Sequence, residues 1–209
     1  MQDDDGGAAA PQPNPLDEPI DFASPGRFTI HNPLPAEPDP VSAAIAGLDP
    51  SQNAQRFSGP AEAIAFAQAL LGRAQRSICL YSHDLEPWLY DNAATRELCT
   101  RFLLASPRNR LRILIRDTTL VVRDGHGLLN LSRRLPSLCH IRRMHPDYPS
   151  AESAFLLIDQ QALLMRPDPR QPSGYVLPDA QARARQCLEA FEQAWQTSLI
   201  DPDLRSMLL

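Results

Sequence analysis

The sequence contains no lysine, and all 20 of its Lys+Arg residues are arginine. This absence excludes a Walker-type phosphate loop, because the motif G-x-x-x-x-G-K-[ST] uses a lysine to hold phosphate oxygens. Arginine is itself well suited to bidentate phosphate contacts. Alanine and proline are also abundant, however, so we interpret the arginine-only composition as the mark of a GC-rich genome and not of phosphate binding.

Metal motifs and paired cysteines are missing as well. The sequence has no C-x-x-C pair and no H-E-x-x-H, and the spacing of His140, His145 and Asp147 matches no usual metal site. We therefore expect no metal and no cofactor. Each of the four cysteines lies in an apolar run, which predicts buried thiols in a reducing compartment: Cys79, Cys99, Cys139 and Cys187.

The sequence also lacks a run of about 18 apolar residues, the minimum for a transmembrane helix. Its first residues, Met-Gln-Asp-Asp-Asp, are acidic where a signal peptide would be basic. We therefore expect a cytoplasmic protein without a membrane partner.

Charge and proline divide the chain into two parts. Residues 1–55 hold ten prolines, nine acids and one arginine, and they lack the periodicity of a packed element. We predict a disordered acidic Pro-rich tail there, with one mildly apolar patch at Ile20–Ile30. Residues 56–209 hold 16 acids and 19 arginines, a net charge of +3. Since nucleic-acid binding needs a clustered basic face, we do not expect nucleic acid as a partner.

Hydrophobic periodicity in residues 56–209 predicts alternating helices and strands. A helix start at Gly59-Pro60 and a capping Asp179 mark the first and last helices. The predicted helices are 60–74, 92–105, 125–135 and one from 179; the predicted strands are 77–82, 111–116, 138–142, 154–158, 162–165 and 173–177. This order predicts an α/β fold with a mixed sheet flanked by helices.

The hairpin has the sequence Glu152-Ser-Ala-Phe-Leu-Leu-Ile-Asp159, followed by a turn and a second apolar strand. It resembles the H-x-K-x4-D motif of the phospholipase D superfamily. Asp159 matches the final Asp, whereas Glu152 replaces the nucleophilic His and Ala154 replaces the phosphate-binding Lys. Residues 60–198 are similar to one half of a phospholipase D catalytic unit. The chain also looks like an uncharacterised bacterial family with this degenerate pattern.

The resemblance implies a site shared between two such halves, and hence a homodimer. In that family one His attacks phosphorus, the other protonates the leaving group, the Lys residues hold the phosphate and the Asp orients its His. With His and Lys replaced, the resemblance implies a pseudoenzyme. Arg166, on the next strand, could restore a cation only if it points inward. Asp159 is then interpreted as a strand-end or turn residue.

Polar residues also follow the first two predicted strands. Since α/β folds place ligands at the carboxyl ends of strands, His83, Asp84 and Glu86 could line a pocket with Asp117. The alternative is that they cap helices and satisfy loop backbone.

A further candidate is the segment Arg123-Asp-Gly125-His126-Gly127, which opens a predicted helix. Glycines there allow a ligand to approach, and a helix N-terminus favours anions. Together with Arg116 it is our candidate site for a phosphate or carboxylate, and His126 could alternatively be a structural histidine. The arginine pairs Arg133–Arg134 and Arg142–Arg143 form a second cluster of basic residues, which we interpret as a solvated face.

Three functions remain open from the sequence. The first is a non-catalytic binding or assembly module that takes an anionic ligand or a protein partner. The second is a hydrolase or transferase with a rebuilt site on a phosphorylated or nucleic-acid substrate; its candidate catalytic residues are Glu152, Asp159, His83, Asp117, His126 and Arg166. The third is a domain that binds nucleic acid without catalysis.

Overall fold

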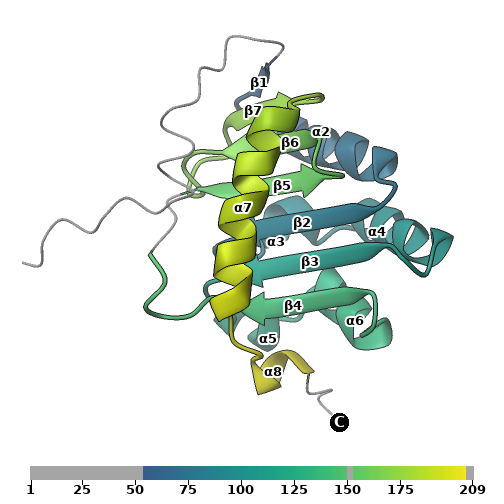
Figure 1. Ribbon diagram of the computed structural model, residues 1–209, viewed down its shortest axis with the longest axis vertical. Coiled ribbons are helices and arrows are strands. Elements are labelled where there is room, and N and C mark those ends of the chain that lie inside the picture. Colours follow the sequence, from purple (N-terminus) through teal and green to yellow (C-terminus); the bar gives the residue numbers. More distant parts are fainter. Residues whose placement is uncertain (1–53, 150–152, 206–209) are drawn as a thin grey trace, which may run out of the picture. The chain divides into compact units, whose positions relative to one another are not determined.

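The computed structural model describes residues 54–149 and 153–205. Its strands, labelled in Figure 1, are β1 (Gln55–Phe57), β2 (Ser77–Ser82), β3 (Arg110–Ile115), β4 (Cys139–Arg143), β5 (Ala154–Ile158), β6 (Ala162–Arg166) and β7 (Gly174–Leu177). The helices are α2 (Pro60–Arg73), α3 (Pro87–Tyr90), α4 (Ala93–Ala105), α5 (Thr119–Arg123), α6 (Gly127–Arg134), α7 (Gln181–Thr197) and α8 (Pro202–Arg205). The tail predicted for residues 1–55 lies outside the described residues, apart from its last two.

The seven strands form one mixed sheet in the order β1-β7-β6-β5-β2-β3-β4. Strands β2, β3 and β4 are parallel, and β5, β6, β7 and β1 are each antiparallel to a neighbour. The predicted α/β fold with a mixed, helix-flanked sheet is therefore confirmed. Strand β1 was not predicted, because its three residues carry no alternation that separates them from the preceding segment.

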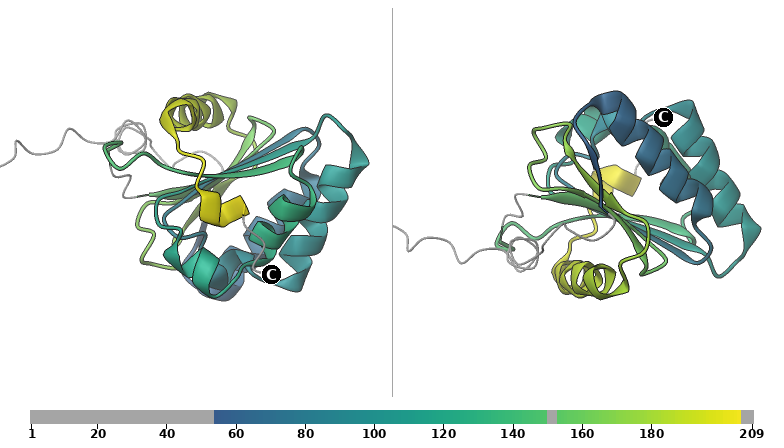
Figure 2. Two further views of the ribbon diagram at one scale, coloured as in Figure 1. Left: turned by 90° about the horizontal axis from the view of Figure 1, so that it is seen from below. Right: turned by 90° about the horizontal axis from the view of Figure 1, so that it is seen from above.

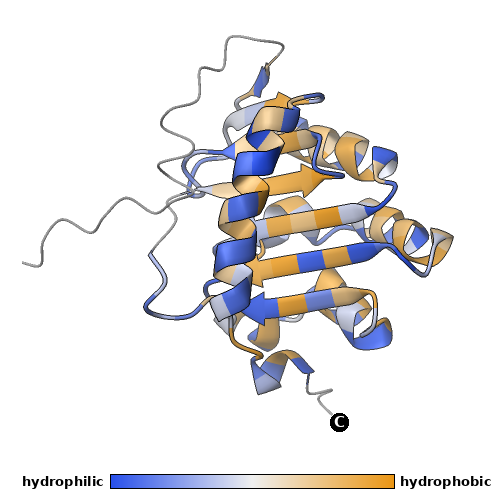
Figure 3. Cartoon of the chain, viewed as in Figure 1, coloured by the Kyte–Doolittle hydropathy of each residue, from blue (hydrophilic) through white to orange (hydrophobic). Residues whose placement is uncertain are grey.

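The two faces of the sheet are covered differently. Helices α2, α4 and α6 lie on one face, and α7 crosses the other face alone (Figure 2). Each face has its own apolar cluster: Leu80, Ile113 and Leu156 belong to the first, whereas Tyr81 and Phe155 belong to the second. Hydropathy follows the same division, since β5 and β6 are almost wholly apolar and β3 and β4 carry polar positions (Figure 3). Polar side chains therefore gather at the β4 side of the sheet.

The helix predicted over residues 125–135 differs from the structure. A short helix, α5, precedes it in a stretch that we expected to be a loop, because the Asp117 carboxylate accepts the N–H of Thr119 and starts a turn. Gly125, at φ 78°, then separates α5 from α6. A residue in this left-handed region ends a helix, so α6 begins two residues later than predicted.

The hairpin forms where it was predicted, with an unusual turn. Asp159 and Gln160 both have positive φ values, 51° and 58°, a conformation that normally favours Gly or Asn. The predicted cap Asp179 is wrong, since α7 starts after Ala180 without a side-chain cap. The Asp179 carboxylate instead accepts a hydrogen bond from Gln161 next to the hairpin turn, at 3.3 Å.

Within residues 54–149 and 153–205, none of the helices has the length and apolar character that crossing a membrane requires.

Candidate functional site

One edge of the sheet gathers the candidate site residues. Strands β2 and β6 end there and β5 begins there, so the loops after β2 and β6 lie beside the start of the hairpin. The register places Ala154 directly opposite Arg166. In the motif the position of Ala154 belongs to the phosphate-binding Lys. In this chain a cation, Arg166, lies on the neighbouring strand directly opposite that position.

Arg166 points inward and is enclosed on every side by this chain. Its side chain is 1% exposed, and its guanidinium forms an ion pair with the Glu86 carboxylate at 2.7 Å. The same guanidinium donates to the carbonyl oxygens of Pro169 and Gln171 in the β6–β7 loop. The ring of Trp88 covers it, with the guanidinium carbon 4.8 Å from the ring centroid. All of its charge is thus engaged within the protein.

Glu86 is held in an uncommon backbone conformation. Leu85 and Glu86 have φ values of 67° and 37°, a left-handed pair without glycine that costs free energy of order 1–3 kcal/mol per residue. Side-chain hydrogen bonds fix this loop: Ser82 Oγ accepts the N–H of Leu85 at 2.9 Å, and Asp84 accepts the N–H of Glu86 at 3.0 Å. The strained loop turns the Glu86 side chain towards Arg166.

Burial sets the protonation of this pair. Glu86 is 3% exposed, and burial raises its pKa to about 7, while the positive charge of Arg166 opposes the rise. Because the folded-state pKa lies above that of the unfolded chain, protonation of Glu86 favours the folded state. Its contribution to stability is fully present below pH 4.5 and is lost as the pH rises through about 7.

The matching Asp of the motif lies at the opposite end of β5. The Asp159 carboxylate accepts the backbone N–H groups of Gln75, Arg76 and Ser77, at 2.7, 2.7 and 2.8 Å. A five-residue strand separates it by roughly 17 Å from the start of the hairpin. The structure therefore places Asp159 in the hairpin turn, bonded to the backbone before β2, as the interpretation as a turn residue expects. Glu152 itself lies outside the described residues.

The residues predicted after β2 and β3 do come together, through backbone contacts. The carbonyl oxygen of His83 accepts the N–H groups of Arg116 and Asp117, at 3.0 and 2.8 Å. Asp117 starts α5, and its hydrogen bonds with Thr119 lower its pKa. The Arg116 guanidinium donates to the carbonyl oxygens of Tyr148 and Pro149, at 2.8 and 3.0 Å. These groups organise the loops at the carboxyl edge.

The start of α6 satisfies its own N–H groups. His126 is buried, and its Nδ1 accepts the N–H of Leu128 at 3.0 Å. The next amide, on Gly127, donates to the Asp91 carboxylate at 2.8 Å. Burial lowers the pKa of His126, which favours neutral imidazole as a cap. The N–H groups of Gly127 and Leu128 at the helix start are thus already bonded within the chain.

Two other members of the predicted anion site do not turn towards it. Arg123 is exposed and pairs with the adjacent Asp124 carboxylate at 2.6 Å. Arg116 is committed to the loop before β5, as described above. The structure therefore does not bring Arg116, Arg123 and Arg166 into one cluster.

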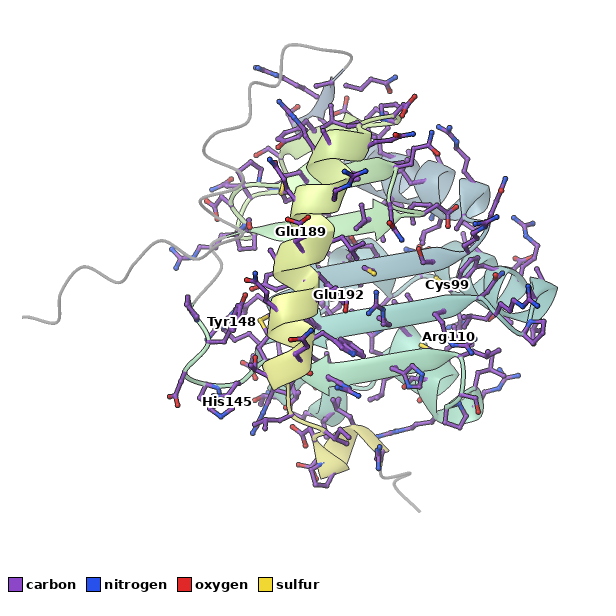
Figure 4. All side chains as sticks on the ribbon, in the orientation of Figure 1. Cys99, Arg110, His145, Tyr148, Glu189 and Glu192 are labelled. Carbon is purple, nitrogen blue, oxygen red and sulfur yellow. The ribbon has the colours of Figure 1, made fainter. Side chains whose placement is uncertain are left out.

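A basic sheet face was missed at the sequence level. Residues 93–149 hold eleven arginines and four acids. The register pairs Arg112 with His140. Arg110 lies two positions before Arg112, and Arg142 lies two positions after His140, so all four side chains point to the same face of the sheet. Helix α7 covers this face only partly (Figure 1). Figure 4 shows Arg110 at the end of the sheet away from α7, and Glu192 on α7. We call Arg110, Arg112, His140 and Arg142 the basic face.

Contacts with α7 fix two of these arginines. The Arg112 guanidinium pairs with Glu192 at 2.7 Å, and that of Arg142 lies 4.5 Å from the centroid of Trp195. Burial lowers the pKa of His140, and the charges of Arg142 and Arg110 lower it further. The alternation of Arg110 with Arg112, and of His140 with Arg142, was visible in the sequence. Only the register of β3 against β4 places the two pairs side by side.

Among the residues that the structure describes, no three His, Cys, Asp or Glu side chains gather as metal ligands would.

Comparisons with known proteins define the family and the fold. The model of a family described as "Domain of unknown function (DUF7931)" matches residues 59–207. No curated protein matches the chain.

Solved structures similar to this chain include the following three. Nuc from Salmonella typhimurium, a phospholipase D family member, is 13% identical over 70% of this chain and 95% of its own, with a TM-score of 0.51. TrmBL2, an archaeal chromatin protein whose structure shows a novel mode of DNA binding, is 13% identical over 71% of this chain and 55% of its own, with a TM-score of 0.52. NucT from Helicobacter pylori is 8% identical over 70% of this chain and 98% of its own, with a TM-score of 0.46. The similarity to Nuc shows that the chain has a phospholipase D-like fold.

Proposed function

We propose that this chain, which belongs to the DUF7931 family of unknown function, is a non-catalytic binding or assembly module with a phospholipase D-like fold. The observation that carries the proposal is the buried ion pair between Glu86 and Arg166. It occupies the place where the resembled family exposes a lysine to its substrate. Arg166 lies opposite Ala154 in the sheet register, and it is 1% exposed.

The chemistry of the site supports this proposal. Phosphodiester cleavage needs cations that meet the charge developing on the phosphoryl oxygens. Here Arg166 pairs with Glu86 at 2.7 Å, its guanidinium donates to loop carbonyl oxygens, and the ring of Trp88 covers it. A homodimer, as the resemblance implies, would bring together two sites closed in the same way. We therefore expect no cleavage, whether the protein is a monomer or a dimer.

The basic face supports nucleic-acid binding as a second candidate function. Its three arginines lie on the adjacent strands β3 and β4 on one face of the sheet, and clustered arginines are what a phosphate backbone selects. The similarity to TrmBL2 is compatible with this candidate, although DNA binding is a property of that protein. The net charge of +3 for residues 56–209 hides the local excess of arginine over acid in residues 93–149, because most of the acids lie elsewhere in the domain.

Electrophoresis of labelled single- and double-stranded DNA with the full chain tests both functions. We expect no cleavage products above the buffer control. If the basic face binds DNA, the band shift weakens steeply between about 50 and 200 mM salt. The double variant Arg110→Glu/Arg142→Glu removes the shift, whereas the control Arg73→Glu/Arg170→Glu, on other elements, retains it. Cleavage that disappears in Arg166→Met would contradict the non-catalytic proposal.

A further inference from the structure

The outer edge of β4 is an open sheet edge. β4 is the last strand of the sheet, and its outer side is paired at one point in the described part of the chain, an antiparallel bridge between Arg143 and Leu199. The two N–H to C=O bonds of this bridge measure 3.0 and 2.7 Å. The protein thus already adds one residue of an antiparallel strand to this edge.

The ladder geometry shows which backbone groups remain available. The C=O of Leu138 and the N–H of Met144 bond to β3 at the two ends of the ladder. The backbone N–H and C=O groups of the even-numbered β4 residues therefore point towards β3. Backbone groups of odd-numbered residues therefore point outward. Arg143 uses its pair with Leu199, and Cys139 N–H donates to Leu135 C=O at 2.9 Å. This leaves the N–H and C=O of Ile141 and the C=O of Cys139 facing outward.

The chain turns away from this edge directly after the bridge. Asp201 is 8% exposed, accepts the hydroxyl of Thr118 at 3.1 Å and lies 3.6 Å from the Arg143 guanidinium. It also caps α8 by accepting the N–H of Asp203 at 3.0 Å. These contacts pull residues 201–205 into α8. Otherwise a continuing strand would bring residue 201 opposite Ile141.

A groove remains between β4, the end of α6 and α8. It has a volume of about 360 Å³, and its lining includes Arg133, Ile141, Arg142, Ile200, Leu204 and Arg205. Ile141, Ile200 and Leu204 contribute apolar side chains to its lining, and Ile200 is 51% exposed. Arg133 holds α8 in place through the carbonyl oxygens of Asp203 and Leu204, at 3.0 and 3.1 Å. The groove therefore combines an open backbone edge, some apolar side chains and positive charge.

We propose that this groove binds an extended acidic peptide segment of a partner protein, which adds a strand to the β4 edge. A peptide backbone supplies both the donor and the acceptor that Ile141 and Cys139 need. A phosphate backbone offers acceptors and leaves the two carbonyl groups unpaired. A second copy of this chain would bring the arginines of two grooves together, and like charges disfavour that pairing. Acidic side chains complement the positive charge that Arg133 and Arg205 bring to the groove.

The inference names a partner class for the proposed binding role and does not depend on the Glu86–Arg166 pair. DNA cleavage would contradict the proposed function and leave this inference standing. Loss of peptide binding would contradict the inference and leave the non-catalytic proposal standing.

Selection from a display library of random 12-residue peptides on the immobilised full chain provides the test. We expect enrichment of peptides rich in Asp and Glu, and measure their affinity by fluorescence anisotropy. Ile141→Pro removes one outward N–H, which an edge strand tolerates, and should weaken binding about tenfold. Arg205→Glu should weaken binding by a similar factor, whereas Arg185→Glu, an exposed charge reversal on α7, should change it less than about twofold.

Three results would overturn the inference: no enrichment, enriched peptides that bind Ile141→Pro as tightly as the wild type, or a dimer in sedimentation that Ile141→Pro dissociates. Circular dichroism melting verifies that the variants fold. If Ile141→Pro does not fold, Arg205→Glu and Ile200→Glu carry the same test, because both side chains lie outside the ladder.

Discussion

Replacing Glu86 by methionine is expected to destabilise the domain by about 3–5 kcal/mol, because removal of one partner leaves a buried charge uncompensated. The Arg166 guanidinium is 1% exposed, so water cannot replace the lost carboxylate. Urea denaturation of the full chain at pH 8 measures the change in unfolding free energy.

The reciprocal change, Arg166→Met, has a pH-dependent cost. Without the guanidinium, Glu86 takes up a proton more readily, since burial already raises its pKa to about 7. The penalty of Arg166→Met should therefore be large at pH 8 and smaller at pH 5. The sign follows from linkage: a carboxyl with a raised folded-state pKa favours the folded state below its pKa and disfavours it above.

The double variant Glu86→Met/Arg166→Met separates charge pairing from packing. Two unbranched apolar side chains of similar length replace the pair, and such replacements of buried ion pairs are often neutral or stabilising. We expect the double variant to lose less stability at pH 8 than either single variant. Equal, additive losses from the two single changes would show that the two side chains act independently.

Replacing Asp159 by alanine is the second change with a large expected effect. Its carboxylate is the acceptor for three successive backbone N–H groups before β2, at 2.7 to 2.8 Å. Charge-assisted bonds of this kind are stronger than neutral ones. The site is partly exposed, so water compensates for some of the loss. We expect a decrease of about 2–3 kcal/mol in unfolding free energy by urea denaturation.

Asp159→Asn is the matched control for this prediction. Asparagine tolerates the φ of 51° and keeps one acceptor oxygen, so its cost should be about half that of alanine. An alanine variant as stable as the wild type would show that Asp159 is not the anchor of the hairpin turn.

The architecture could be predicted from the sequence because its signals are local. The apolar strand Ser77–Ser82 and the hairpin around Asp159 are short runs bounded by polar residues, and their order alone indicates an α/β fold. Helix α5 was missed because one carboxylate, Asp117, decides its start.

The site was harder to predict because it depends on distant pairs. Glu86 and Arg166 are 80 positions apart, and only the sheet register and the left-handed turn at Leu85–Glu86 bring them together. The helix start at Gly127 was predicted as an anion site, but Asp91, 36 positions earlier, already occupies it. No local pattern shows that a donor is already satisfied.

Whether phosphate can reach Arg166 tests the non-catalytic proposal most directly. Titration of the ¹⁵N-labelled full chain with inorganic phosphate, followed at the Nε–H resonance of Arg166, measures it. We expect this resonance to stay unchanged up to millimolar phosphate, because Glu86, Trp88 and the loop carbonyl groups enclose the guanidinium. A saturable shift that is altered in Glu86→Met would show an open phosphate site and contradict the non-catalytic proposal.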